Sequence, residues 1–156
     1  MNSIEIESES IEETKKLGEA IADSIVFGDV ILLDGEMASG KTALSRCIFS
    51  RLGYSGVSSP TFTIINQYGR GETVSYHADA YRLNDEEDFT AAGFDECTDG
   101  ELTVIEWAEK IGRVRENDEI HIEIKITGEN KRLFRITARK AFCEALEGIM
   151  NEDTGN

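Results

Sequence analysis

The chain has 156 residues, and its 31 acidic against 16 basic side chains give a formal net charge of −15 at pH 7. This length fits a single domain over residues 1–156, and the charge disfavours direct binding along a nucleic-acid backbone, which depends on lysine and arginine displacing counterions. Three scattered cysteines and the lack of an apolar run of bilayer length favour a reduced, cytoplasmic protein with no membrane association and no disulfide-linked partner.

The first predicted elements are a helix, a strand and a second helix. Residues 10–25 carry apolar side chains at helical spacing, and Ser10 with Glu13 matches a capping box. "VILLD", residues 30–34, is an apolar run typical of a strand buried on both faces of a parallel sheet. Helical spacing resumes after a glycine-rich loop and ends at Gly53. This order predicts strand, loop and helix around the loop.

A hairpin, a short helix and another buried strand are predicted next. Residues 61–68 and 73–81 flank the turn-forming "GRGE" and indicate an antiparallel hairpin. Residues 84–93 begin with a capping asparagine and end in glycine, which predicts a short acidic helix. "LTVIEW", residues 102–107, predicts a second buried strand.

The C-terminal third predicts a second hairpin and a last helix. Residues 119–126 and 132–138 alternate strictly around "TGENK", which indicates a hairpin near a sheet edge, and a helix is expected over 141–150. The elements together predict an α/β fold of three layers, with a mixed, partly parallel central sheet flanked by helices. Its core is expected over about residues 10–140, followed by the C-terminal helix and tail over 141–156.

Charge is distributed unevenly along the chain. Residues 83–109 contain acidic and no basic side chains, whereas residues 131–140 contain basic and no acidic ones. Two solvated faces explain the pattern most simply. A pair of surfaces that dock partners is the alternative.

The glycine-rich loop carries the chemistry. Residues 35–42, G-E-M-A-S-G-K-T, match G-x-x-x-x-G-K-[ST] between a predicted strand and a helix. Gly35 and Gly40 allow the backbone to curl so that its N–H groups face phosphates at the helix N-terminus. Lys41 is expected to reach the β and γ phosphates, and the hydroxyl of Thr42 to bind Mg²⁺. The loop predicts a P-loop NTPase-like fold.

Two carboxylates could complete a metal site. Glu106 ends the second buried strand, and Asp79 lies in the strand-like "HADAYR"; Mg²⁺ needs few protein oxygens beside phosphates and waters. The alternative for both is an exposed charge at a strand end. His77 and Arg82 stay ambiguous, and Trp107 could stack on a base, support the site or pack in the core.

A threonine and a missing motif narrow the nucleotide chemistry. Thr61 follows the only proline, in "SSPTFT", and could sense the γ phosphate or the metal as a switch residue. The guanine motif N-K-x-D is absent, since "NKRL" at 130 departs from it. ATP with Mg²⁺ is therefore the expected nucleotide.

The order of these motifs resembles the TsaE family, also called YjeE. The resemblance spans about residues 10–140 and lies in "EETKKLG", "GEMASGKT", "SSPTFTIINQY", "HADAYRL", "GFDE" and "VIEWAEKI". It implies a small cytosolic ATPase that takes part in making threonylcarbamoyladenosine beside the anticodon of tRNA. The implied partner is the TsaB–TsaD pair, which performs the carbamoyl transfer, and tRNA would be reached only through that complex.

The resemblance also implies residue roles. Thr42 and Glu106 become the expected Mg²⁺ ligands, with Asp79 as a catalytic or metal-shell acid and Thr61 as the switch threonine; Lys41 is expected on the phosphates. Thr14 and Glu12 are expected near the adenine, and Glu109 and Arg132 at the nucleotide. The full predicted nucleotide site is Glu12, Thr14, Gly35, Ala38, Ser39, Gly40, Lys41, Thr42, Ala43, Trp107, Glu109 and Arg132.

The sequence departs from the family pattern in two places. "MASGK" replaces the usual L-G-A-G-K, which puts Ala38 and Ser39 in the phosphate loop, and "IEWAE" lacks a common proline. Two alternatives to the ATPase remain. One is a P-loop small-molecule kinase, and the other is a nucleotide-gated binding module without productive hydrolysis.

Overall fold

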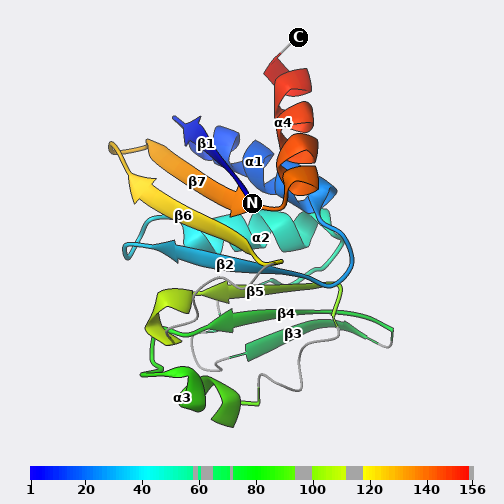
Figure 1. The fold of residues 1–156 in the computed structure, drawn as a ribbon, viewed down its shortest axis with the longest axis vertical. Coiled ribbons are helices and arrows are strands. Elements are labelled where there is room, and N and C mark those ends of the chain that lie inside the picture. The colour runs from blue at the N-terminus through cyan, green and yellow to red at the C-terminus, as the bar shows by residue number, and fades with distance from the viewer. Residues whose placement is uncertain (58–59, 61–64, 71, 94–99, 112–117, 155–156) are drawn as a thin grey trace.

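The computed structural model describes residues 1–57, 60, 65–70, 72–93, 100–111 and 118–154 (Figure 1). Its elements follow the order strand, helix, strand, helix, two strands, helix, strand, short 3-10 helix, two strands and helix. They are β1 (Asn2–Ser8), α1 (Ile11–Ser24), β2 (Asp29–Gly35), α2 (Lys41–Arg51), β3 (Ile65–Arg70), β4 (Thr73–Asp79), α3 (Glu86–Ala91), β5 (Leu102–Glu106), η2 (Ala108–Ile111), β6 (Ile120–Ile126), β7 (Arg132–Ala138) and α4 (Lys140–Thr154).

One mixed sheet of seven strands runs through the molecule in the order β1-β7-β6-β2-β5-β4-β3. Strand β2 pairs in parallel with β5 on one side and β6 on the other, and β4 extends the parallel part beyond β5. Strands β3 and β7 run in the opposite direction to their neighbours. The predicted mixed, partly parallel sheet is confirmed. Strands β3, β4 and β5 lie on one side of β2, and β6 and β7 lie on the other. The topology therefore switches at β2, and a crevice is expected at the carboxyl end of this strand.

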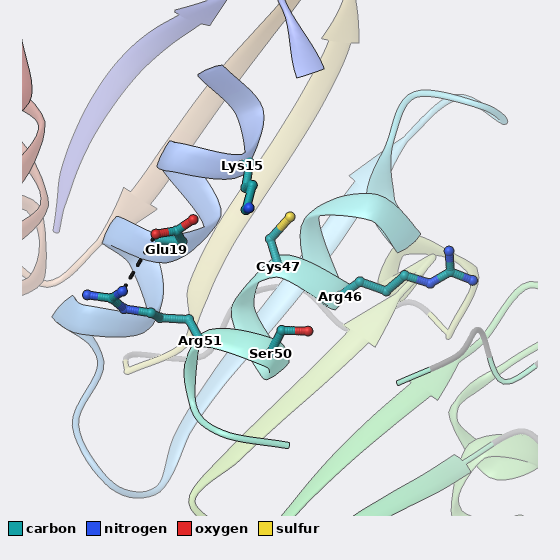
Figure 2. Close-up of a pocket in the computed structure, with 6 residues that line it drawn as sticks. All are labelled: Lys15, Glu19, Arg46, Cys47, Ser50 and Arg51. Atoms are coloured by element: carbon teal, nitrogen blue, oxygen red, sulfur yellow. Dashed lines mark ion pairs between the residues drawn. The ribbon is translucent and has the colours of Figure 1, made fainter. Parts of the chain in front are cut away.

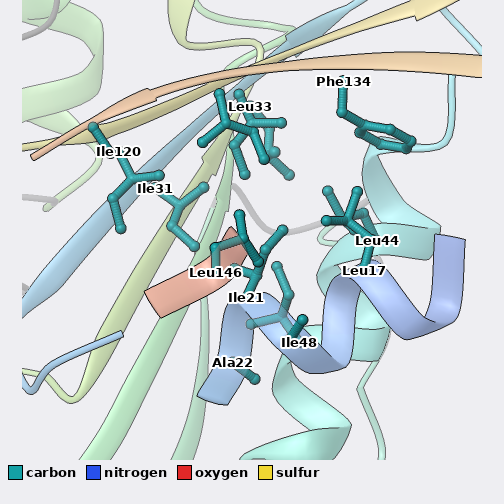
Figure 3. Close-up of a cluster of buried hydrophobic side chains, with 14 of the residues drawn as sticks. Leu17, Ile21, Ala22, Ile31, Leu33, Leu44, Ile48, Ile120, Phe134 and Leu146 are labelled. Carbon is teal, nitrogen blue, oxygen red and sulfur yellow. The ribbon is translucent and has the colours of Figure 1, made fainter. Parts of the chain in front are cut away.

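Helices α1, α2 and α4 cover one face of the sheet (Figures 1 and 3). Their buried residues interlock with inward-facing side chains of β2, β5, β6 and β7 in one large cluster. On the other face a smaller cluster is closed by the turn after β4 and by η2, and includes Leu32, Ile105 and Ala108. The carboxyl ends of β2, β4 and β5 are therefore held between two packed layers.

Side chains alternate between the two faces of the central strands. The face of β5 that packs against α2 is apolar along most of its length and becomes polar at the carboxyl end of the strand. Leu102 and Val104 of β5 belong to the large cluster, and Glu106 lies two residues further on the same face. In β4 the same period puts His77 and Asp79 on one face and Ala78 on the other. The strand ends thus direct polar side chains towards the start of α2.

Some predicted elements differ from those observed. Strand β1 had no counterpart among the predictions, and it forms the sheet edge beside β7. The predicted second hairpin therefore lies one strand further in. Helix α3 is capped by Asp85, whose Oδ1 accepts from Asp88 N at 2.9 Å, rather than by Asn84. Ile11, at the expected apolar spacing in α1, is 80% exposed.

Acidic side chains pair with the basic segment 131–140. Arg135 donates to Glu5 Oε1 at 3.0 Å, and Lys131 lies 3.9 Å from Glu9. Arg139 donates to Asp29 Oδ1 of β2 at 2.7 Å. These basic side chains are thus neutralised within the chain, which leaves less charge for an external partner than the sequence suggested.

No helix in the described part of the chain is long and apolar enough to cross a membrane. Cys47 and Cys143 carry free thiols, and burial raises the pKa of both. Cys97 lies outside the described residues.

Candidate functional site

The phosphate loop connects the end of β2 to the start of α2. An added Cβ at Gly35 would lie 2.8 Å from the carbonyl oxygen of Ile124 and 2.7 Å from Ser39 Oγ, so only glycine fits there. Gly40 caps α2 with φ 110°, a left-handed conformation that glycine adopts without strain. Ala38 has φ 64°, which is costly for an alanine. Two glycines and one strained alanine therefore form the tight curl.

Lys41 folds back over its own loop. Its side chain is buried, and Nζ donates to the carbonyl oxygens of Gly35 at 2.5 Å and Glu36 at 2.8 Å. The same ammonium lies 3.8 Å from the centroid of the Trp107 ring, within range of a cation–π interaction. Burial lowers the pKa of Lys41, while the negative charges of Glu106, Glu109, Asp34 and Asp79 oppose that shift. The lysine ammonium is thus under the electrostatic influence of four carboxylates.

Glu106 joins β5 to the first turn of α2. Its Oε1 accepts a hydrogen bond from Thr42 Oγ1 at 3.1 Å, and its Oε2 accepts one from His77 Nε2. His77 is completely buried, and its Nδ1 faces the hydroxyl of Tyr68 at 3.5 Å. Because the carboxylate can only accept, the imidazole carries its proton on Nε2. Both carboxylate oxygens are therefore fixed by neighbours.

Asp79 lies directly opposite Glu106 in the parallel register of β4 and β5. Its Oδ1 accepts from the backbone N–H of Tyr81 at 2.9 Å, which fixes the side chain at the turn. Burial raises the pKa of Asp79, the Tyr81 N–H acts in the opposite direction, and the charge of Glu106 adds to the increase. A half-buried acid with a raised pKa at this position is suited to general acid–base work.

Trp107 forms an aromatic wall. The residue has φ 59°, which is rare for a residue with a bulky side chain, and its backbone N–H donates to Leu33 O at 2.9 Å. The Tyr81 ring lies 5.0 Å from it. Such backbone strain is typical of functional sites.

These groups surround one pocket of about 320 Å³. The structure brings most of the predicted site residues together there. The lining residues are Met37, Ala38, Ser39, Gly40, Lys41, Thr42, Ala43, Asp79, Tyr81, Glu106 and Trp107. Gly35 does not line the pocket, but its carbonyl oxygen accepts a hydrogen bond from Lys41 Nζ.

Besides Gly35, four predicted nucleotide contacts among the described residues lie outside that lining. Glu12 is exposed at the start of α1, and Thr14 Oγ1 lies 2.7 Å from Ser8 Oγ. Glu109 lies in the first turn of η2, close enough to Lys41 to affect its pKa, and Arg132 Nε donates to Ser39 O at 2.9 Å. Their contacts with a nucleotide stay predictions. Thr61 lies outside the described residues.

Three side-chain oxygen donors that could hold a Mg²⁺ ion border the pocket. Among the described residues no three His, Cys, Asp or Glu side chains gather into a metal-binding group. The oxygens of Thr42 and Glu106 are adjacent, and Asp79 borders the same pocket. Mg²⁺ prefers such hard oxygens and takes its remaining ligands from phosphates and water.

A second hollow of about 440 Å³ lies between α1 and α2 (Figure 2). Its lining includes Lys15, Arg46 and Cys47, and in the figure Arg46 extends away from Lys15 while Arg51 turns to Glu19. Although it is larger, the hollow shows neither the convergent side chains nor the strained backbone of the first pocket. The phosphate-loop pocket is therefore the candidate site.

Sequence reasoning missed several of the site's residues. Tyr81 and Met37 were not predicted, and both line the pocket. His77 was left ambiguous, although the two-residue spacing between His77 and Asp79 puts both on one face of a strand. That spacing was the available signal for His77. Nothing in the sequence indicated that the side chain of Asp34 lies close to Glu109.

A family model described as "Threonylcarbamoyl adenosine biosynthesis protein TsaE" matches residues 8–134. The chain belongs to the TsaE family. This membership confirms the resemblance drawn from the order of the motifs. The matched range contains the whole phosphate loop, both carboxylates and Trp107.

Relatives within the TsaE family cover most of the chain. A protein from Rickettsia felis named "tRNA threonylcarbamoyladenosine biosynthesis protein TsaE" is 36% identical over 80% of this chain and 74% of its own length. A protein of the same name from Bacillus subtilis is 36% identical over 86% of this chain and 88% of its own. The crystal structure of Bacillus subtilis YdiB covers 97% of each chain with a TM-score of 0.74 at 28% identity.

Proposed function

We propose that this chain is a Mg²⁺-dependent ATPase required for threonylcarbamoyladenosine modification of tRNA, acting with a TsaB–TsaD-type complex. Family membership and the names of the relatives support the pathway. The single observation that carries the chemistry is the Thr42–Glu106 hydrogen bond of 3.1 Å, which joins the phosphate loop to a buried strand-end carboxylate. This arrangement pairs a phosphate cradle with metal-binding oxygens in one pocket.

The loop and Lys41 bind the phosphates of ATP. The start of α2 lines the pocket, and there the first N–H groups of the helix, which lack partners within the helix, and the helix dipole favour negative charge. Lys41 exchanges its contacts with the carbonyl oxygens of Gly35 and Glu36 for contacts with phosphate oxygens. Bound Mg²⁺ supplies positive charge to the phosphates, and Thr42 and Glu106 would hold it.

Asp79 and Glu106 divide the remaining work. The bond from His77 fixes the Glu106 carboxylate, so its free lone pairs keep one direction. Asp79 accepts a hydrogen bond from the attacking water, and its raised pKa brings it nearer to the range of a useful base. Lys41 then stabilises the negative charge that develops on the transferred phosphoryl group.

Phosphate release in the presence of Mg²⁺ and a purified TsaB–TsaD-type complex tests this function. We expect slow turnover by the chain alone and faster turnover with the complex. Lys41→Ala and Glu106→Ala should each reduce the stimulated rate by about 100-fold or more. Arg46→Ala, an exposed change on α2 in the second hollow, should leave the rate unchanged.

The same variants and two further measurements separate the alternative functions. Unchanged hydrolysis by Lys41→Ala and Glu106→Ala would show that the site is assigned wrongly. Full tRNA modification with a non-hydrolysable ATP analogue in multiple turnovers would favour a nucleotide-gated binding module. Transfer of the γ phosphate to a metabolite, in place of free phosphate, would favour a kinase.

A further inference from the structure

Asp34 has no direct part in the proposed mechanism, but it joins three segments of the chain. It is the penultimate residue of β2 and immediately precedes Gly35 of the phosphate loop. Its buried carboxylate accepts from the backbone N–H of Glu109 through Oδ1 at 3.1 Å and from His121 Nε2 through Oδ2 at 2.7 Å. Both oxygens thus have a donor, one from η2 and one from β6.

The bond to Glu109 determines where the chain goes after Glu106. Between Glu106 and Glu109 the backbone turns sharply through Trp107, whose φ is 59°. Two backbone N–H groups of this corner donate to β2: Trp107 N to Leu33 O at 2.9 Å, and Glu109 N to Asp34 Oδ1 at 3.1 Å. Both acceptors belong to consecutive residues of β2. The strained corner is therefore anchored to the strand that leads into the phosphate loop.

The bond from His121 fixes Asp34 in turn. In the parallel register His121 lies opposite Leu32. Its side chain therefore reaches diagonally from β6 to the carboxylate of Asp34, two residues further along β2. The His121 side chain is 22% exposed, and its Nδ1 lies 3.9 Å from Glu123 Oε1. Because Asp34 can only accept, His121 carries a proton on Nε2. The imidazole thus donates to Oδ2 of Asp34, the carboxylate oxygen that the backbone N–H of Glu109 does not contact.

We propose that Asp34 and His121 are positioning residues, a carboxylate–imidazole bridge that holds the corner after β5 and thereby keeps Trp107 over Lys41 and Glu106 beside Thr42. The inference rests on the proposed function for its effect on ATP turnover, but its structural part does not. Neither residue lines the pocket, so the bridge acts through the residues that do. Outer partners of this kind typically alter metal affinity or activity by about 10- to 100-fold when removed.

Trp107 offers a direct probe, because it is the only tryptophan in the chain. The experiment compares His121→Leu, which removes the donor, with His121→Gln, whose amide N–H can donate from nearly the same position. Glu123→Gln is the matched control, since it removes a neighbouring charge on β6 but leaves the bond to Asp34. Tryptophan emission and its quenching by acrylamide are measured on the nucleotide-free proteins, and the Mg²⁺ concentration for half-maximal ATP turnover on the same samples with the partner complex.

We expect His121→Leu to shift the emission to longer wavelength, increase quenching and raise the half-activating Mg²⁺ concentration by roughly 10-fold. His121→Gln should restore most of each value, and Glu123→Gln should behave as the wild type. If His121→Leu does not fold, Asp34→Asn replaces it, because the amide keeps an acceptor for Glu109 and loses the charge that His121 binds.

Two results would overturn the bridge: a folded His121→Leu protein with wild-type emission and quenching, or an equal change in Glu123→Gln. A wild-type half-activating Mg²⁺ concentration in a His121→Leu protein with shifted emission would overturn its effect on Glu106. If even the wild type shows no ATP turnover while His121→Leu shifts the emission, the proposed function fails and the bridge stands.

Discussion

Asp34 and Glu106 at the carboxyl ends of β2 and β5 are buried, and Asp79 at the end of β4 is half-buried, whereas charged side chains on the uncovered face of β1, β7 and β6 lie in solvent. Lys41 is 5% exposed and Glu106 is 2% exposed. Arg135 and Glu5, which pair across β7 and β1, have side chains that are 42% and 53% exposed. The same kinds of group therefore occupy two very different dielectric environments in one sheet.

Burial determines how strongly a charged side chain affects stability and activity in this fold. A buried charge loses its hydration, so it must be matched by neighbours, and Glu106 is matched by Thr42 and His77. An exposed pair gains little because water screens it and because two long side chains lose entropy. We therefore expect substitutions at the buried end to change stability and activity strongly, and those at the open face to change both little.

His77→Leu should have the largest effect on stability. It removes the imidazole from a buried carboxylate, and breaking one partner of such a pair typically lowers the free energy of unfolding by about 3–5 kcal/mol. Urea unfolding followed by circular dichroism measures the change. The double variant His77→Leu/Glu106→Leu, which has no unpaired buried charge, should recover part of the loss. A loss below about 1 kcal/mol in the single variant would show that water reaches Glu106.

Asp79→Asn should separate activity from stability. We expect ATP turnover to fall by about 100-fold, because the amide cannot accept a proton from water. The pKa of Asp79 is higher in the folded than in the unfolded chain, chiefly through burial, so the folded state binds its proton more tightly. The free energy of unfolding therefore falls as pH rises between the two pKa values and stays lower at neutral pH.

The amide removes that penalty. Asp79→Asn should have a higher Tm than the wild type at pH 7, and the difference should vanish as pH falls below about 4, where the unfolded carboxyl is protonated. Thermal scans at both pH values measure it. An equal or lower Tm at pH 7 would contradict the burial of this carboxyl.

Ala38→Gly tests the strain in the phosphate loop. At φ 64° an alanine is disfavoured by roughly 1–2 kcal/mol, and part of that is offset by the entropy that glycine loses on folding. We expect a net gain of about 0.5–1 kcal/mol in the free energy of unfolding. Ala43→Gly, in the first turn of α2, is the matched control and should lose up to about 1 kcal/mol. Equal signs for the two variants would argue against the strain.

Local features of the site were predictable from the sequence, and pairings between distant strands were not. The phosphate loop depends on residues within one short segment, and Glu106 was recognisable because it ends an apolar strand. The His77–Glu106 bond depends on the register of β4 against β5, which neither strand specifies by itself. The same holds for Asp34, whose partners come from η2 and β6.

Strand β1 shows the same limit for the fold. Its alternating Ile4 and Ile6 are half-buried, but Glu5 and Glu7, which alternate with them, have weak strand propensity. Its partner strand lies far along the chain, and the Glu5–Arg135 pair spans 130 residues. Pairing with β7 therefore decides the structure of this segment, which its own composition leaves open.

Arg135→Ala should have the smallest effect, although its guanidinium lies near two acids. It donates to Glu5 at 3.0 Å and lies 3.8 Å from Glu123, and all three side chains are well exposed. We expect a loss of at most about 0.5 kcal/mol in the free energy of unfolding, shrinking further in 0.5 M salt because screening weakens exposed pairs. ATP turnover should not change. A loss above about 2 kcal/mol, unaffected by salt, would mean that this face is desolvated, and the contrast between the two ends of the sheet would then no longer rest on burial.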